Sequence, residues 1–401
     1  MGRAGAAPPA RPLSLSVRLH HAFPGFSLDI AFDAPTPGVV ALFGSSGAGK
    51  SSIVAALAGL LRPDHMRAEL DGALLADTEA GLWQPPERRR VGLVFQDARL
   101  FPHLSVSGNL RYGLRRVRGP VADRRIGFDE VVETLGIAHL LRRQPHTLSG
   151  GERSRVAIGR ALLAQPLLLL MDEPLASLDA ARKAEILPYL ARLRDALRVP
   201  IVYVSHALEE VVRLSDTLVL IEAGRVLACG PLELVAGRAD LPIALRDDAG
   251  GVLPVRVAAH LPERGLTRLS TGRDEIWVPL LDAVAGTALR VRVPAREVML
   301  ARPDALTTPE AFSVHNALAG TVKALAQGAG GRTTLVEVAL ADGALLARVT
   351  PDAVNRLALR PGAAVLALFK SVTVEVLVEP EASRGHGTLE PALAQRGGRV
   401  A

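Results

Sequence analysis

The chain reads Gly44-Ser45-Ser46-Gly47-Ala48-Gly49-Lys50-Ser51 at the point that decides its fold. This stretch matches the phosphate-loop pattern G-x-x-x-x-G-K-[ST], which binds phosphates when it follows a strand and opens a helix. The run from Gly38 to Phe43 predicts the strand, and a helix is predicted from about Lys50 to Leu61, stopped by Pro63. Backbone N–H groups and the helix N-terminus would surround the phosphates. The stretch therefore predicts a nucleotide site; a glycine-rich turn that merely starts a helix is the alternative.

Two side chains of this loop are expected to contact the nucleotide or its metal ion directly. Lys50 can reach the β- and γ-phosphates of ATP, and Ser51 can ligate Mg²⁺. The neighbouring Ser52 is included in the expected ATP-binding set.

Two acids follow a second apolar run, Leu167 to Met171. A buried strand places the carboxylates that follow it at the edge of the sheet where the phosphate loop also lies. Asp172 is therefore expected to hold Mg²⁺ through water, and Glu173 to polarise the attacking water.

Further buried strands are predicted at Ile201 to Val204 and at Thr217 to Glu222, with helical patterns such as Arg182 to Leu197 between them. Strands that alternate with helices predict an α/β core with a mainly parallel sheet. The earlier segment from Leu13 to Asp33 alternates apolar and polar residues and predicts antiparallel strands.

A second candidate anion site is the turn Leu148-Ser149-Gly150-Gly151-Glu152. Ser149 and the backbone of Gly150 and Gly151 would present hydrogen-bond donors at a helix N-terminus. An ordinary Ser-Gly-Gly turn that caps a helix is the alternative. The turn resembles the signature motif of ABC ATPases, which faces the nucleotide bound by the opposite subunit.

Three more segments resemble elements of the ABC family in the expected order: Gln96, the run Ser177-Leu178-Asp179, and His206. The resemblance implies that Gln96 senses Mg²⁺ and the transmembrane partner, and that Asp179 lies in a segment crossing the dimer interface. It also implies that His206 contacts the γ-phosphate, although a lone histidine is often a core or surface residue.

Two positions depart from the family pattern. No tyrosine is available to stack on adenine in the early strands, which leaves His20, His21, Phe23 and Phe26 as candidates. Ser154 stands where a glutamine is common after the signature turn.

The resemblance covers nearly all of residues 13–240 and implies a homodimer that closes on two molecules of ATP with Mg²⁺. It assigns catalysis to Glu173, His206 and Gln96. It also implies integral-membrane permease subunits as partners, docked on the helical segment between Gln96 and Leu148, and an external oxyanion-binding protein as an indirect partner.

Beyond residue 240 the sequence predicts β-structure, because short strand-like runs recur between Gly and Pro residues. We expect an OB-like barrel module with a linker at 241–309, a second barrel at 310–379, and disordered ends at 1–12 and 380–401.

The second barrel resembles the molybdate-binding barrel of molybdate import ATPases. The resemblance lies in Ser313-Val314-His315-Asn316, where arginine is usual at His315, and in Lys370-Ser371. Ser313, His315, Lys370 and Ser371 would supply the donors and positive charge that a tetrahedral oxyanion needs. A lysine that only protects a sheet edge is the alternative for Lys370. Importers of sulfate, tungstate, polyamines or sugars remain alternatives for the substrate.

Composition agrees with a peripheral subunit on the cytoplasmic side of the cell (inner) membrane. The single cysteine, Cys229, allows no internal disulfide, and no apolar run is long enough to span a bilayer. The net charge of +6 comes from scattered arginines, so no nucleic-acid partner is expected. A soluble ABC ATPase acting on DNA or ribosomes would usually carry two ATPase cores, and an oxyanion-sensing regulator would carry a DNA-binding helix pair.

Overall fold

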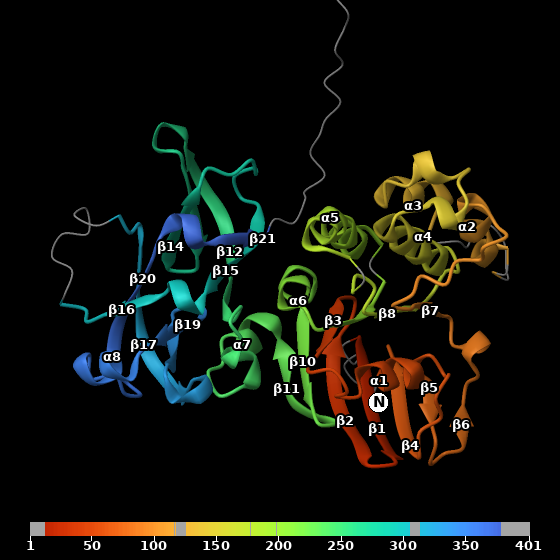
Figure 1. Ribbon diagram of the computed structural model, residues 1–401, viewed down its shortest axis with the longest axis horizontal. Helices are drawn as coiled ribbons and strands as arrows, with labels where there is room; N and C mark the ends of the chain where they lie inside the picture. Colours follow the sequence, from red (N-terminus) through yellow and green to blue (C-terminus); the bar gives the residue numbers. More distant parts are fainter. Residues whose placement is uncertain are drawn as a thin grey trace, which may run out of the picture.

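The computed structural model describes residues 13–115, 117, 126–176, 178–197, 199–304 and 313–377. The terminal segments predicted to be disordered, 1–12 and 380–401, lie outside these residues. Figure 1 shows a part with one large sheet and most of the helices beside a part built mainly of β-strands. We refer to residues 13–240 as the N-terminal module and to residues 241–377 as the C-terminal module.

The N-terminal module is built on one mixed sheet of eleven strands. In spatial order the strands are β6 (Leu82–Trp83), β5 (Ala73–Asp77), β4 (His65–Leu70), β1 (Ser14–Phe23), β2 (Phe26–Pro35), β11 (Arg225–Pro231), β10 (Thr217–Glu222), β3 (Val39–Phe43), β9 (Ile201–Ser205), β8 (Leu168–Asp172) and β7 (Val91–Val94).

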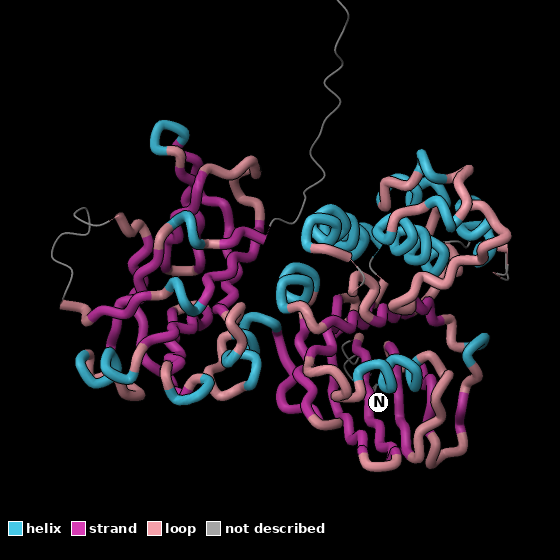
Figure 2. Tube along the Cα trace, viewed as in Figure 1, coloured by secondary structure: helices cyan, strands magenta, loops and turns pink. Residues whose placement is uncertain are grey.

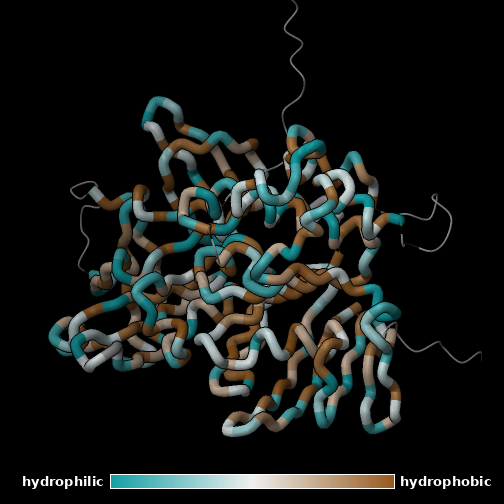
Figure 3. Tube along the Cα trace, turned by 45° about the vertical axis from the view of Figure 1, so that its right-hand side comes forward, coloured by the Kyte–Doolittle hydropathy of each residue, from teal (hydrophilic) through white to brown (hydrophobic). Residues whose placement is uncertain are grey.

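Strands β10, β3, β9, β8 and β7 run parallel to their neighbours, which confirms the predicted α/β core. Every residue of β3 and β9 is buried, as expected for strands covered on both faces. At the other end, β1, β2, β4, β5 and β6 form antiparallel pairs. Burial alternates along β2, and the strands at the bottom of Figure 3 alternate between hydrophobic and hydrophilic colours.

Helices cover both faces of the parallel strands. Ile53 and Leu57 of α1 pack with Leu170 and Val204 on one face. On the other face, Leu169 and Tyr203 pack with α2, α3, α4 and α5, which we call the helical cluster. Figures 1 and 2 show this helical cluster apart from α1. The helices of the module are α1 (Lys50–Leu57), α2 (Val106–Leu114), α3 (Phe128–Thr134), α4 (Gly150–Leu162), α5 (Ala180–Leu197), α6 (Leu208–Leu214) and α7 (Leu232–Ala236).

Helix α1 is shorter than the sequence predicted, because it ends at Leu57 and not at Leu61. Gly59 adopts a positive φ of 80°, and the N–H of Leu60 turns back to the carbonyl of Ala55. The glycine therefore terminates the helix before Pro63 can do so.

The C-terminal module contains two five-stranded antiparallel sheets and the short helix α8 (Pro351–Arg356). The first sheet has the order β14 (Asp274–Pro279), β13 (Leu266–Thr271), β12 (Gly250–Leu261), β15 (Ala288–Pro294) and β21 (Glu375–Leu377). The second has the order β16 (Met299–Ala301), β20 (Ala364–Phe369), β17 (Asn316–Gln327), β18 (Thr334–Leu340) and β19 (Gly343–Val349).

The two sheets exchange edge strands, which the sequence did not reveal. Strand β16 precedes residue 310 yet pairs with β20 of the second sheet, and β21 follows β20 yet pairs with β15 of the first. Val291 of the first sheet and Phe369 of the second belong to one continuous hydrophobic core. A division of the chain between residues 309 and 310 therefore assigns β16 and β21 to the modules opposite to the sheets in which they pair.

Arg290 on β15 connects the C-terminal module to the N-terminal one. Its Nε lies 2.9 Å from Glu233 of α7, and its Nη2 lies 3.2 Å from Asp216. Asp216 also accepts the N–H of Val39, at the start of the strand that leads to the phosphate loop. Within the described ranges, no helix has both the length and the apolar character that crossing a membrane requires.

Candidate functional site

The predicted nucleotide residues emerge at one edge of the parallel sheet. Phe43 of β3 pairs with Ser205 of β9, and Val204 of β9 pairs with Asp172 of β8. Gly44, Glu173 and His206 directly follow the last residues of these three strands. Gln96 follows the parallel neighbour β7 and has an exposed side chain. The strand order thus brings four distant segments to a common edge.

The phosphate loop wraps around Lys50. The Nζ atom of Lys50 donates to the carbonyls of Gly44 at 2.9 Å and Ser45 at 2.8 Å, and the residue is only 5% exposed. Burial lowers the pKa of the Lys50 ammonium, while Glu173 and Asp172 oppose this shift. Ser45, Ser46 and Gly47 are exposed, Ala48 is buried, and Ser52 is half-buried on α1. The loop therefore presents its outer residues to solvent and holds the lysine beneath them.

Two glycines of the loop are required by their surroundings. A Cβ on Gly44 would lie 2.0 Å from the carbonyl oxygen of Ile221. Gly49 has a φ of 98°, and a Cβ there would lie 2.4 Å from a methyl carbon of Leu28. Gly49 also caps α1 without any side-chain hydrogen bond to the helix N-terminus. The first N–H groups of α1 thus have no side-chain cap to compete with a phosphate oxygen.

Ser51 and Asp172 form an oxygen-donor pair suited to Mg²⁺. The Oγ of Ser51 donates to Oδ1 of Asp172 at 3.1 Å. Burial raises the pKa of Asp172; the Ser51 hydrogen bond and Lys50 oppose this, and Glu173 reinforces it. Among the described residues there is no group of three or more His, Cys, Asp or Glu that could hold a metal ion. One carboxylate and one hydroxyl nevertheless fit Mg²⁺, which takes its remaining ligands from water and phosphates.

Glu173 and His206 face each other beside this pair. The Nδ1 of His206 lies 3.1 Å from Oε2 of Glu173. Glu173 has a positive φ of 47°, a conformation that costs free energy for a residue with a side chain. Its N–H is bonded to the carbonyl of Val204, so the adjacent strand holds this backbone in place. The carboxylate is thereby directed towards the residue that the family pattern assigns to the γ-phosphate.

The signature turn lies at the N-terminus of α4, in the helical cluster and apart from α1 in Figure 1. Ser149 caps the helix by accepting the N–H of Glu152 at 3.3 Å, and its own N–H donates to the Glu152 carboxylate at 2.7 Å. A Cβ on Gly150 would lie 2.8 Å from Leu178, and one on Gly151 would lie 2.9 Å from Ile186. Both glycines therefore allow the turn to pack against the start of α5.

Asp179 lies at the start of the same helix. It is exposed, and its Oδ1 accepts the N–H of Arg182 at 2.9 Å. The predicted interface residue Ser177 lies outside the described residues. Ser154, noted as a departure, is buried and donates to the carbonyl of Pro174 at 3.0 Å. It thus connects the signature helix to the segment after Glu173.

Of the four aromatic candidates for the adenine contact, Phe26 lies nearest the phosphate loop. Its Cζ would be 3.3 Å from a Cβ on Gly49. The ring of Phe23 lies 6.1 Å from that of Phe26, across the hairpin between β1 and β2. His21 instead contacts Asp64, and the exposed His20 lies beside His65. Phe26, with Phe23 beside it, therefore lies next to the phosphate loop.

Three of the predicted oxyanion residues, His315, Lys370 and Ser371, lie at one end of the second sheet of the C-terminal module. Asn316 of β17 pairs with Phe369 of β20, so His315 and Lys370 flank the same end of these strands. The Oγ of Ser371 lies 3.4 Å from Nδ1 of His315, whereas Ser313 and Lys370 are exposed. Asn316 is fully buried and exchanges two hydrogen bonds with the backbone of Trp277. This asparagine, the last residue of the quoted Ser313–Asn316 motif, fixes the segment to the first sheet.

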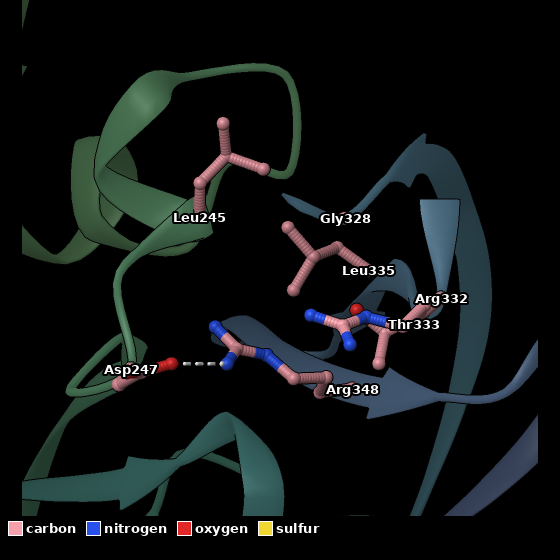
Figure 4. A pocket seen from close by; sticks show the side chains of 7 residues that line it. All are labelled: Leu245, Asp247, Gly328, Arg332, Thr333, Leu335 and Arg348. Atoms are coloured by element: carbon pink, nitrogen blue, oxygen red, sulfur yellow. Dashed lines mark hydrogen bonds and ion pairs between the residues drawn. The ribbon is translucent and has the colours of Figure 1, made fainter. Parts of the chain in front are cut away.

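A cavity of about 190 Å³ lies within the C-terminal module (Figure 4). Arg348 of β19 and Arg332, which precedes β18, point into it, and Arg348 lies 3.2 Å from Asp247. None of its lining residues belongs to the nucleotide edge or to the oxyanion residues; they are Leu245, Asp247, Gly328, Arg332, Thr333, Leu335 and Arg348.

Sequence reasoning also missed a buried polar group on α6, the helix that follows His206. Glu210 lies on α6 among the buried residues Leu208, Val211 and Val212. A glutamate within such an apolar run is a signal in itself, because a buried carboxylate requires donors.

Comparison with known proteins gives a consistent result. The family model for ABC transporters matches residues 28–176, and the model for the TOBE domain matches residues 313–376. A molybdenum import ATP-binding protein, ModC, of Granulibacter bethesdensis is 51% identical over 376 residues, which cover 91% of this chain and 98% of that protein. The proteins of the same name from Mesorhizobium japonicum and Rhizobium etli are 47% and 46% identical, covering 90% of this chain and 96% and 100% of their own length.

Proposed function

The chain belongs to the family of molybdenum import ATP-binding proteins of ABC transporters, and we propose that it hydrolyses ATP to drive molybdate uptake through a membrane-embedded permease. The observation that carries the proposal is the convergence of Lys50, Asp172, Glu173 and His206 at one edge of the sheet.

Each residue of this edge has a role in phosphoryl transfer to water. The loop N–H groups and Lys50 hold the phosphates, with Gly44, Ser45, Ser46, Gly47, Ala48, Gly49, Ser51 and Ser52 forming the cradle. Ser51, Gln96 and, through water, Asp172 would hold Mg²⁺, which would supply positive charge to the phosphate oxygens. Glu173 orients the attacking water, and His206 donates a hydrogen bond towards the γ-phosphate. Phe23 and Phe26 provide the apolar surface for the adenine ring.

The complete site requires two copies of the chain. Ser149, Gly150 and Gly151 present N–H and O–H donors on a helical cluster that stands apart from α1. This separation supports a contact of the signature turn with the nucleotide of a second subunit. Asp179 accompanies them, because the signature turn packs on the segment beside it. ATP binding closes this homodimer and hydrolysis reopens it.

Opening and closing of the dimer moves the permease. The helical segment between Gln96 and the signature turn is the docking surface for this partner, with 13–240 as the ATPase domain and 241–309 and 310–379 as the regulatory β-modules. The protein lies on the cytoplasmic side of the cell membrane, where ATP is available. An external oxyanion-binding protein acts only through the permease, and nucleic acid has no role.

Transport by the reconstituted complex tests this function. Vesicles that contain the chain and its permease should accumulate labelled molybdate when supplied with ATP and Mg²⁺, and a tenfold excess of sulfate should not compete. Vesicles with Glu173→Gln serve as the inactive control. Uptake of sulfate, a polyamine or a sugar in place of molybdate would assign the chain to another solute, with the β-modules acting only in regulation.

The cluster of Ser313, His315, Lys370 and Ser371 is proposed to bind an oxyanion. Lysine and hydroxyl donors suit a tetrahedral dianion, and a hydrogen bond to a charged group contributes about 1.5–3 kcal/mol. Lys370→Ala should therefore weaken binding of molybdate about 10- to 100-fold. Isothermal titration of the full chain with molybdate measures this, with Arg356→Ala as a control that removes an exposed cation from the same module. Equal heats for phosphate and molybdate, or for Lys370→Ala and the unaltered chain, would contradict it.

A further inference from the structure

Glu210 is a buried carboxylate that accepts three hydrogen bonds. It is 3% exposed. Its Oε2 accepts the hydroxyls of Tyr203 and Ser205, each at 2.8 Å, and its Oε1 lies 2.8 Å from Nζ of Lys183. Burying an ionised carboxylate is costly unless it is paired and hydrogen-bonded, and here three donors meet that requirement.

These three donors come from elements that surround the nucleotide edge. Tyr203 and Ser205 belong to β9, the strand that ends immediately before His206. The Oγ of Ser205 also accepts the N–H of Ala207 at 3.0 Å, so it spans the backbone on both sides of His206. Since this hydroxyl donates its proton to Glu210, the carboxylate fixes the orientation in which the hydroxyl can accept.

Lys183 extends the connection to the segment that crosses the dimer interface. Its N–H is bonded to the carbonyl of Asp179, one helical turn earlier on α5. The Glu210–Lys183 ion pair therefore ties α5 to α6. Burial and the charge of Glu210 raise the pKa of the Tyr203 hydroxyl. Tyr203 therefore stays protonated and donates its hydrogen bond to Glu210.

We propose that Glu210 is a positioning residue that holds the Ser205–Ala207 turn and so keeps His206 aligned with Glu173. Through its ion pair with Lys183, Glu210 also couples this alignment to α5, the helix that begins after Asp179. The proposal rests on the ATPase function proposed above. His206 itself is exposed and contacts only Glu173 among the hydrogen bonds of the described residues, so its own side chain does not fix its position. Displacing a catalytic group by about 1 Å can cost on the order of 100-fold in rate.

Glu210→Gln tests this role, because it keeps the shape of the side chain but removes its charge and leaves Lys183 without a carboxylate. We expect kcat for ATP hydrolysis to fall about 10- to 100-fold, with KM for ATP within twofold of its original value. The matched control is Glu209→Gln on the same helix, where Glu209 is exposed and forms an ion pair with Arg213. Its kcat should stay within twofold.

A double-mutant cycle separates positioning from a merely structural role. In a His206→Ala background, Glu210→Gln should cause no further loss of kcat, because the group that it positions is already absent. Ser205→Ala removes the hydroxyl between Glu210 and the Ala207 N–H but leaves the ion pair of Glu210 with Lys183. It should also lower kcat in the original chain and cause no further loss in the His206→Ala background. It replaces Glu210→Gln in this test if that variant does not fold. A loss that persists in the His206→Ala background, or an unchanged kcat in both variants, overturns the proposal. Either result leaves the ATPase function standing, since Glu173→Gln tests that function independently.

Discussion

Replacement of Glu173 by glutamine is expected to slow ATP hydrolysis by about 10²–10⁴-fold, the range by which a positioned general base contributes to rate. Glutamine preserves the size of the side chain and a hydrogen bond to His206, so the geometry at the ends of β8 and β9 should persist. Binding of ATP should be retained, because the phosphate loop and Lys50 are untouched. The closed dimer should then accumulate, which size-exclusion chromatography with ATP and Mg²⁺ measures.

Glu263→Gln provides the control for this experiment. Glu263 is an exposed glutamate in the C-terminal module and is remote from the nucleotide edge, so its rate should be unchanged. Normal turnover by Glu173→Gln would refute the assigned role of this residue. A variant that neither binds ATP nor dimerises would instead show that Glu173 supports the fold of the loop.

Replacement of Asp172 by asparagine is expected to lower kcat/KM for MgATP by about 10- to 100-fold, the usual cost of losing a residue that supports a metal through water. Asparagine can still accept the Ser51 hydrogen bond but carries no charge to attract Mg²⁺. The loss should diminish as the concentration of Mg²⁺ is raised, and a titration of ATPase rate against Mg²⁺ measures this. An effect that is independent of Mg²⁺ would contradict the metal role.

The same variant should be more stable than the unaltered chain when nucleotide and metal are absent. The pKa of Asp172 is raised above its ordinary value of 3.8 in the folded state, chiefly by burial. The stability contributed by this group is therefore complete below pH 3.8 and is lost as pH rises through the raised pKa. An asparagine side chain does not titrate and has no such dependence. The melting temperature of Asp172→Asn should exceed that of the unaltered chain at pH 7, and the difference should vanish as pH approaches 3.8.

Much of the nucleotide edge could be predicted because its signals are local. The phosphate loop, Asp172 and His206 each follow a short apolar strand, and parallel strands necessarily bring such residues to one edge. The glycines of the loop are recognisable from the local motif, although the close approach of Ile221 that requires a glycine at position 44 is a contact between distant segments. The end of α1 also has a local signal, because Gly59 adopts a positive φ and ends the helix before Pro63.

The contacts that could not be predicted join residues far apart in the chain. The partners of Glu210 lie on β9 and α5, and nothing in the pattern around Glu210 identifies Lys183. A three-residue strand such as β16 carries no register of its own, so its pairing with β20 depends on the assembled core. The adenine contact was ambiguous for the same reason, since only the folded hairpin shows that Phe26 approaches Gly49.

The exchange of β16 and β21 has a consequence for the order of events during synthesis on the ribosome. Strand β15 is flanked by β12 on one side, but its other neighbour is β21, at Glu375–Leu377. Until those residues have left the exit tunnel, one side of β15 offers unpaired backbone groups to any strand of a neighbouring nascent chain. Maturation of the first sheet therefore waits for nearly the last described residue, and a stalled or prematurely released chain would be prone to aggregate through β15.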